Sequence, residues 1–276
     1  MSKNLPFRIE RPISATCERV FDAWTQDEST RQWLFRTLNG TLIDSANDPR
    51  PGGALAITEE RNGEEARHDC HWIELERPGR LVFQFFDVPA TLTLTPTDQG
   101  CRAVLEHEVD PDYAERTLQG WQGIFDGMIN SMADVPEMIV RRRLQAPPSV
   151  VFPLFTDPDS LAKWWGPNGF RTVTHSMDFR EGGQWIFTMH GPDGKAWENV
   201  VDYLEIVPNE LIRFGHGEPD AIHFENRISF APTNDGGTEV VLQLRFKTME
   251  RKRDAMPYAV PGGHQTLGRL AEQLGE

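Results

Sequence analysis

The densest group of side chains able to bind a metal ion lies in the segment RHDCHW, residues 67–72. His68, Cys70 and His71 are all common metal-ligand types. If the segment is an alternating strand, however, His68 and Cys70 share one face and His71 points to the other. At most two ligands then converge on one point, so we expect neither a metal site nor a metal cofactor here.

Two histidines near predicted element ends are the candidates for proton transfer. A cavity can tune histidine as a general acid or base, because histidine titrates near neutral pH. His216 ends the strand-like segment LIRFGHG and His264 opens a predicted helix, so these two are the candidate catalytic residues. The chain has no G-x-S-x-G, H-E-x-x-H, Walker or G-x-G-x-x-G sequence. We therefore expect no cofactor, and the residues leave open whether the protein is an enzyme.

Aromatic side chains at alternating positions point to a different chemistry, the binding of an apolar molecule. In QWIFTMH, residues 184–190, three large side chains fall on one face of the predicted strand. Concave apolar surfaces with few polar groups are the usual ligand pockets. The candidate ligand-binding residues are Trp164, Trp165, Trp185, Phe187, Met189, Trp197 and Phe214 in the second half of the chain, and Trp33, Trp72, Phe83, Phe85 and Trp121 in the first.

The paired tryptophans end a predicted helix in FTDPDSLAKWWGPNGF, residues 155–170. Adjacent residues on a helix point about 100° apart, so Trp164 and Trp165 are not expected to enter one pocket equally. We expect one of them to anchor the helix in the core, which is the commonest role of a large aromatic side chain. Lining a ligand pocket is the alternative for the other.

The chain repeats one pattern twice. VFDAWTQDESTRQWL, residues 20–34, matches VFPLFTDPDSLAKWW, residues 151–165, at a constant offset of 131. Glycine pairs at 52–53 and 182–183 follow in the same order, as do the later apolar segments. Internal repeats indicate a duplicated architecture. We predict two domains of the same kind, residues 1–135 and residues 136–276.

Both copies have the same predicted order of elements. An alternating strand opens each copy, two short helices follow, and turn sequences such as GPDGK and NDGG separate further alternating segments. Each copy then ends in an amphipathic helix. Its apolar stripe consists of Trp121, Ile124, Phe125, Met128, Ile129 and Met132 in the first copy, and of His264, Leu267, Ala271 and Leu274 in the second. This order predicts an α+β fold in which a sheet wraps around a long helix.

The second copy resembles a known family through the motifs VFPLFTDPDSLAKWWGPNGF, FAPTNDGGTEVVLQLRF and GGHQTLGRLAEQL. In this order they are similar to the AHSA1-like branch of the START/Bet v 1-like (SRPBCC) superfamily. The resemblance implies two tandem helix-grip domains, each a curved antiparallel sheet around a long C-terminal helix with two short helices. The first copy is more divergent: it has Trp33-Leu34 in place of two tryptophans and lacks the Gly-Pro-Asn-Gly turn.

The composition and net charge of the chain bear on which partners the protein binds and where in the cell it is located. The chain of 276 residues is 38% hydrophobic and 25% charged, as globular proteins are. Its net charge of −14 argues against nucleic acid as a partner, and the clusters RRR and ERKR are expected to be solvated. No apolar segment approaches the ~18 residues of a membrane helix. The polar start and three widely spaced cysteines predict a cytoplasmic protein.

Three functions from different classes remain. The first is the binding of a small hydrophobic or aromatic ligand between sheet and C-terminal helix. The second is an enzyme of the cyclase, dehydratase or hydrolase kind that uses the same cavity, as relatives with this fold do. The third is a protein-interaction module, because the family resemblance implies a link to the chaperone Hsp90 and hence to stress response. The two copies are also expected to form an intramolecular pseudo-dimer.

Overall fold

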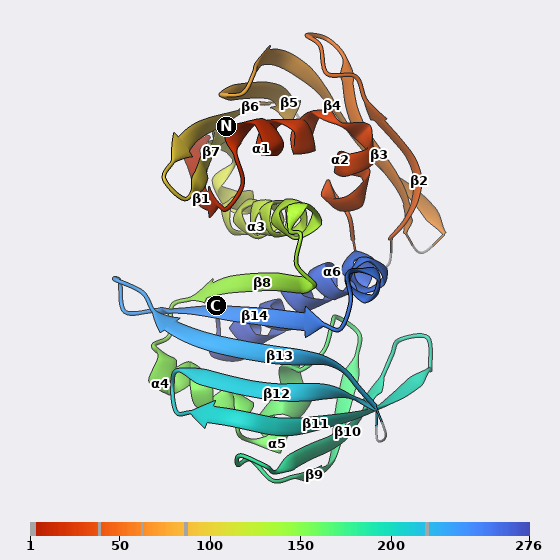
Figure 1. The fold of residues 1–276 in the computed structure, drawn as a ribbon, viewed down its shortest axis with the longest axis vertical. Coiled ribbons are helices and arrows are strands. Elements are labelled where there is room, and N and C mark those ends of the chain that lie inside the picture. Colours follow the sequence, from red (N-terminus) through yellow and green to blue (C-terminus); the bar gives the residue numbers. More distant parts are fainter. Residues whose placement is uncertain (1–3, 38–39, 62, 86–87, 219–220) are drawn as a thin grey trace. The chain divides into compact units, whose positions relative to one another are not determined.

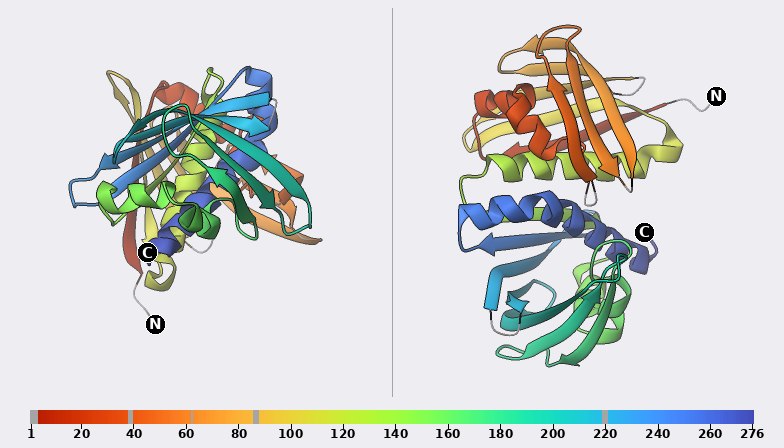
Figure 2. Two further views of the ribbon diagram at one scale, coloured as in Figure 1. Left: turned by 90° about the horizontal axis from the view of Figure 1, so that it is seen from below. Right: turned by 90° about the vertical axis from the view of Figure 1, so that its right-hand side faces the viewer.

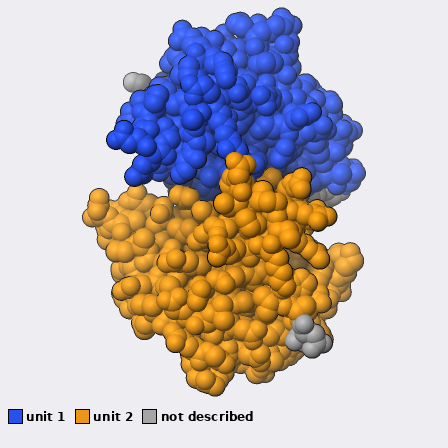
Figure 3. All heavy atoms as spheres, viewed as in Figure 1, with its two compact units in different colours: residues 1–132 blue, residues 133–276 orange. Residues whose placement is uncertain are grey.

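The chain divides into two compact units, residues 1–132 (unit 1) and residues 133–276 (unit 2), coloured separately in Figure 3. The computed structural model describes residues 4–37, 40–61, 63–85, 88–218 and 221–276. The boundary between the units lies three residues before the predicted one at 135/136. Both units are α+β and both are helix-grip domains, which confirms the predicted fold class.

Unit 1 is a seven-stranded antiparallel sheet that curves around one long helix, α3 (Figure 1). The strand order across the sheet is β1-β7-β6-β5-β4-β3-β2, so the first strand of the chain pairs with the last. In chain order the elements are β1 (Leu5–Ile13), α1 (Cys17–Thr25), α2 (Asp27–Trp33), β2 (Gly40–Asn47), β3 (Ala54–Arg61), β4 (Glu64–Glu76), β5 (Arg80–Phe85), β6 (Val88–Thr97), β7 (Gly100–Val109), the 3₁₀ helix η1 (Pro111–Tyr113) and α3 (Ala114–Met132).

Unit 2 repeats this topology, and Figure 2 shows its long helix α6 against its sheet. The strand order is β8-β14-β13-β12-β11-β10-β9. Its elements are β8 (Glu137–Leu144), α4 (Pro148–Val151), the 3₁₀ helix η2 (Phe152–Phe155), α5 (Pro158–Trp164), β9 (Arg171–Met177), β10 (Gln184–His190), β11 (Ala196–Val207), β12 (Leu211–Glu218), β13 (Ala221–Pro232), β14 (Thr238–Phe246) and α6 (Met249–Leu274).

Matching registers define which residues of the two units occupy the same place. Trp72 pairs with Phe83 as Tyr203 pairs with Phe214. Similarly, the Trp72 N–H donates to the Gly53 carbonyl as the Tyr203 N–H donates to the Gly183 carbonyl. Residues matched in this way are called equivalent below.

The final helices present the predicted apolar stripes to the sheets. In α3, Trp121, Ile124, Phe125 and Met128 are buried, and Ile129 and Met132 pack partly against the same core. In α6, Leu267, Leu270 and Ala271 are buried. The 3.6-residue period alone therefore identified the face of each helix that its sheet covers.

Helix α6 begins much earlier than its apolar stripe indicated. It starts at Met249, with the Thr248 side chain accepting a hydrogen bond from the Arg251 N–H, and it runs through Pro257 and Pro261. The segment ERKR therefore lies in its first turns. The expectation that this segment is fully solvated is wrong at Lys252, which is 2% exposed and donates to the carbonyls of Ala133 and Val135. None of the described helices is both long and apolar enough to span a bilayer.

Both paired tryptophans are buried in the core of unit 2. The helix α5 ends at Trp164, and Trp165 already has extended backbone, so the angle between helical neighbours does not apply to it. Their rings meet at 5.4 Å with an interplanar angle of 70°. Arg269 of α6 holds the turn that follows by donating to the carbonyls of Lys163, Gly166, Pro167 and Phe170.

Candidate ligand-binding cavity in unit 1

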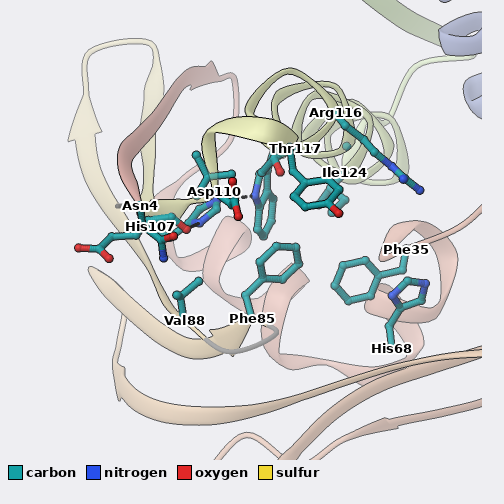
Figure 4. Close-up of a pocket in the computed structure, with 15 residues that line it drawn as sticks. Asn4, Phe35, His68, Phe85, Val88, His107, Asp110, Arg116, Thr117 and Ile124 are labelled. Carbon is teal, nitrogen blue, oxygen red and sulfur yellow. Dashed lines mark hydrogen bonds between the residues drawn. The ribbon is translucent and has the colours of Figure 1, made fainter. Parts of the chain in front are cut away.

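Unit 1 contains a cavity of about 700 Å³ between the inner face of its sheet and the start of α3 (Figure 4). Cavities of about 300–1,000 Å³ are typical of small-molecule sites. The walls come from β4 to β7, from η1 and α3, and from the residue that follows the C-cap of α2. The lining residues are Asn4, Phe35, His68, Phe85, Val88, His107, Glu108, Val109, Asp110, Tyr113, Arg116, Thr117, Gly120, Trp121 and Ile124.

Phe35, Phe85 and Trp121 contribute aromatic rings to the apolar part of the wall. Phe85 lies 4.8 Å from Trp121 and 6.0 Å from Phe35, measured between ring centroids. Trp121 is 1% exposed, whereas Phe35 and Phe85 are half-buried. A flat apolar molecule can therefore contact several ring faces and edges at once, which is the geometry that aromatic groups favour.

His107 connects the sheet to α3 at one end of the cavity. Its Nδ1 donates to the Glu108 carbonyl at 2.7 Å, and its Nε2 accepts from the Trp121 indole N–H at 3.0 Å. Because the indole nitrogen can only donate, Nε2 carries no proton. Burial lowers the pKa of His107, and the hydrogen bond to Glu108 opposes this shift. His107 is thus a neutral residue that orients Trp121.

A buried carboxylate lies behind the opposite end of the cavity. Glu59 is 0% exposed, and its oxygens lie 3.2 Å from Arg36 Nη1 and 3.0 Å from Arg61 Nε. The Thr37 hydroxyl donates to Glu59 Oε2 at 2.7 Å. A buried charge requires such partners, because the loss of solvation is otherwise very costly.

Arg61 connects Glu59 to two residues of the cavity wall, Phe35 and His68. Its Nη2 donates to the Phe35 carbonyl at 3.2 Å and to His68 Nε2 at 3.1 Å. A guanidinium can only donate, so the single proton of a neutral His68 is on Nδ1. Burial lowers the pKa of His68, and the nearby Arg61 charge lowers it further. The imidazole also stacks on Phe35 at 4.7 Å and 21°.

Phe35 itself has an unusual backbone conformation. Its φ of 53° lies in the left-handed region, which bulky L-residues rarely adopt. The hydrogen bond from Arg61 to its carbonyl and the stack on His68 stabilise it there. The equivalent residue in unit 2 is Gly166, with a φ of 112°. Unit 1 therefore places an aromatic ring in its cavity wall where unit 2 has no side chain.

Unit 2 has larger side chains in the equivalent part of its core. Trp185 stacks on Phe187 at 3.9 Å and meets Trp165 at 5.5 Å. The equivalent residues of unit 1 are Leu55, Ile57 and Leu34, all buried. Two indoles and a phenyl ring in unit 2 thus correspond to three aliphatic side chains in unit 1, which leaves more volume under the sheet of unit 1.

The structure distributes the candidate site residues over several environments. Phe85 and Trp121 line the cavity, while Trp33, Trp72 and Phe83 are buried in the core of unit 1. In unit 2, Met189 is half-buried and Trp197 is 42% exposed, with its ring 5.6 Å from Phe170. The remaining candidates are buried in the core of that unit: Trp164, Trp165, Trp185, Phe187 and Phe214.

The two candidate catalytic histidines belong to unit 2. His216 is half-buried and shares a hydrogen bond of 3.0 Å between its Nε2 and Asn199 Oδ1. Burial lowers the pKa of His216 to about 4, so the imidazole is neutral. His264 is half-buried in α6. Neither residue lies in the lining of the cavity of unit 1.

The side chains of residues 67–72 alternate between the two faces of β4, as predicted. His68 lines the cavity, Cys70 is buried on the same side of β4, and His71 is exposed on the other. Over the described residues, no three His, Cys, Asp or Glu side chains are grouped as a metal site would require. The sequence of this segment indicates possible metal ligands only, and it does not indicate that His68 lines a cavity.

His107 was also missed, although a signal was present. In EHEVD, residues 106–110, two glutamates alternate with other residues on β7, and Glu106 and Glu108 are both exposed. The residue between them must then point inward. Phe35 and Arg116 carried no such signal, because nothing in the pattern around either one indicates a cavity.

Comparison with known proteins gives a family match in each unit. The model of the family described as Activator of Hsp90 ATPase homolog 1-like protein matches residues 14–132 and residues 145–275. A comparison with curated proteins gives no match. Solved structures similar to one half of the chain include proteins from Nitrosomonas europaea (22% identity, 50% of this chain and 94% of that chain, TM-score 0.45), Chromobacterium violaceum (28%, 50% and 95%, TM-score 0.42) and an AHSA1-like protein from Aeromonas hydrophila (19%, 46% and 91%, TM-score 0.43).

Proposed function

The chain belongs to the Activator of Hsp90 ATPase homolog 1-like family, with one family domain in each unit, and from this premise we propose that unit 1 binds a small hydrophobic or aromatic molecule. The observation that carries the proposal is the cavity of about 700 Å³ between sheet and α3, with Phe35, Phe85 and Trp121 in its wall. Burying the apolar surface of a ligand there supplies the binding free energy.

Gly120 offers a way to fill the cavity without disturbing the fold. It lines the cavity from α3, and a Cβ atom at this position meets no other atom within 4 Å. A larger residue also favours the helix, because glycine is destabilising there by about 0.5–1 kcal/mol. The Cβ of a larger residue therefore fits at this position, and we expect the side chain of Gly120→Leu to reduce the volume of the cavity without destabilising α3.

The experiment measures the fluorescence of N-phenyl-1-naphthylamine, a neutral aromatic probe, titrated with the full chain. We expect saturable binding with one site per chain, about tenfold weaker binding by Gly120→Leu, and a smaller effect of Gly120→Ala. Gly268→Leu is the matched control in α6, where a Cβ meets only Arg142 Nη1 at 3.9 Å. No saturable binding by the wild type, or equal binding by Gly120→Leu, overturns the proposal.

The family description supports a second candidate, a module that stimulates the ATPase of Hsp90. Its test is the ATPase rate of the Hsp90 from the same organism with and without the full chain. A rate that does not rise with added chain rejects this candidate, whatever the probe titration gives.

The enzyme alternative has less support at this cavity. The predicted acid–base residues, His216 and His264, are in unit 2, and the two ring nitrogens of His107 are both engaged within the protein. We therefore propose that this cavity serves binding rather than catalysis.

A further inference from the structure

The cavity of unit 1 differs in charge between its two ends. Figure 4 shows His107, Asn4 and Asp110 together at one end and Phe35 and His68 at the other, with Arg116 on the side of Phe35 and His68. Phe85 lies between the two groups. A molecule that fills the cavity therefore meets different chemistry at each end.

The end at Phe35 and His68 is positive. Arg116 is exposed on the first turn of α3, and within the described parts of the chain it makes no ion pair or hydrogen bond. Behind His68, the charges of Arg36 and Arg61 exceed the single charge of Glu59 by one. Arg61 is in direct contact with the imidazole. An anionic group at this end is thus attracted from two directions.

His68 adds a hydrogen-bond donor at the same end. Its Nε2 accepts from Arg61, which leaves the proton on Nδ1, and stacking on Phe35 restrains the ring. A neutral imidazole held in one tautomer is a donor of fixed direction. Donors to an ionised acceptor form the stronger class of hydrogen bonds.

The acidic groups of the lining lie at the opposite end. Asp110 Oδ1 already accepts from the Asp112 N–H and so is engaged at the start of η1. Glu108 is exposed on the outward side of β7. The Asp110 carboxylate disfavours an anion at the His107 end and so reinforces the polarity of the cavity.

We propose that the ligand of unit 1 is an amphipathic organic acid. Its aromatic or branched apolar body lies against Phe85 and Trp121, and its carboxylate lies at the end formed by Arg116 and His68. The inference rests on the proposed function, because it names the chemical class of the molecule that the same cavity binds.

Unit 2 has different residues at four of the positions that form or support the positive end. The residues equivalent to Phe35, Glu59, Arg61 and His68 are Gly166, Met189, Gly191 and Asn199. The preference for an acid is therefore specific to unit 1.

The test compares two probes that share one ring system. 8-Anilinonaphthalene-1-sulfonate carries an anionic group, whereas N-phenyl-1-naphthylamine does not. We expect the anionic probe to bind the full chain more tightly, and Arg116→Gln to weaken its binding about tenfold while changing that of the neutral probe less than about twofold. Arg102→Gln is the matched control, because it removes an exposed arginine of β7 that is paired with Glu10 and does not line the cavity. Gly120→Leu should weaken the binding of both probes about tenfold.

The outcomes separate this inference from the proposed function. Equal affinity for the two probes, or an equal effect of Arg116→Gln and Arg102→Gln on the anionic probe, overturns the assignment of an acid but leaves the apolar cavity standing. Failure of the neutral probe to bind the wild type overturns the proposed function itself. A second variant, His68→Phe, keeps the stack on Phe35 but removes the donor, and it should weaken the anionic probe selectively.

Discussion

The same turn after the second short helix has opposite roles in the two units. In unit 2 a glycine, Gly166, takes the positive φ, and Arg269 donates to four carbonyls around it. In unit 1 the equivalent residue is Phe35, whose ring lines the cavity. One position with a positive φ thus closes the core in one copy and forms part of a cavity wall in the other.

The strand residue that faces this turn also differs between the two units. Met189 of unit 2 is an apolar residue whose Cε would lie 2.8 Å from a Cβ on Gly166. Its equivalent, Glu59, is a fully buried carboxylate paired with two arginines. A duplicated fold can therefore exchange an apolar contact for a buried charge network, provided that every partner of the charge changes with it.

The largest expected effect comes from giving unit 1 the residue of unit 2 at this strand position. Glu59→Met leaves Arg36 and Arg61 without their carboxylate, and the free energy of unfolding of unit 1 should fall by roughly 2–4 kcal/mol. Hydrogen exchange of β3 and β4 peptides, resolved by mass spectrometry, measures the change locally. The exposed neighbour Glu60→Met is the control, with an expected effect within about 0.5 kcal/mol.

The double variant Glu59→Met, Arg61→Gly sharpens the comparison, because it also removes one of the unpaired charges. It should be more stable than Glu59→Met alone. If Glu59→Met unfolds at the same urea concentration as the wild type, the pairing of Glu59 with Arg36 and Arg61 contributes nothing to stability. The difference between the two units at this position then has no effect on the free energy of unfolding.

The second expected effect is a loss of stability of unit 2 at acid pH, caused by His216. The equivalent residue in unit 1 is Phe85. The pKa of His216 is about 4 in the folded protein because of burial and the nearby His223, against an ordinary value of 6.5. The unfolded chain therefore takes up the proton first as pH falls. The contribution of His216 is constant above pH 6.5 and turns unfavourable below it, by up to about 3 kcal/mol near pH 4.

His216→Gln retains a donor for Asn199 and does not titrate, so its stability should fall less between pH 7 and 4.5 than that of the wild type. Urea denaturation at several pH values measures this difference. His175→Gln, which removes an exposed histidine of the same unit, is the control. Parallel pH dependences for the wild type and His216→Gln would show that His216 is not the acid-sensitive group.

The smallest effect concerns the turn itself. Gly166→Ala combines a φ of 112° with a Cβ 2.8 Å from Met189 Cε, and it should cost about 1–2 kcal/mol. Gly182→Ala also has a positive φ, of 75°, but its Cβ meets only Arg180 Nη1 at 4.0 Å. Thermal denaturation should show the larger loss for Gly166→Ala, and equal losses would mean that crowding by Met189 is negligible.

Local patterns accounted for most of the fold. Apolar residues at helical spacing identified the buried face of α3, and turn sequences such as GPDGK marked hairpins that the strand pairing contains. The start of α6 was not apparent, because Pro257 and Pro261 interrupt its pattern and its first turns carry charges. Interruptions of this kind hide a helix that tertiary packing still stabilises.

Fewer residues of the candidate site could be predicted from the sequence. Phe85 and Trp121 belong to apolar patterns and were among the candidate residues, whereas His68 and Arg116 were not. Glu59 lies in β3 and its partner Arg36 follows α2, so their pairing depends on a contact between residues far apart in the chain. Spacing along the sequence carries no information about such a contact.

The sequence by itself determined the duplicated topology, because that depends on periodicity, turn chemistry and a repeated order of motifs, all of which are local. Only the tertiary structure decided that unit 1 holds a cavity with a positive end. A cavity is the volume left after side chains from many strands and helices have packed, and here it depends on Leu34, Leu55 and Ile57 standing where unit 2 has two indoles and a phenyl ring.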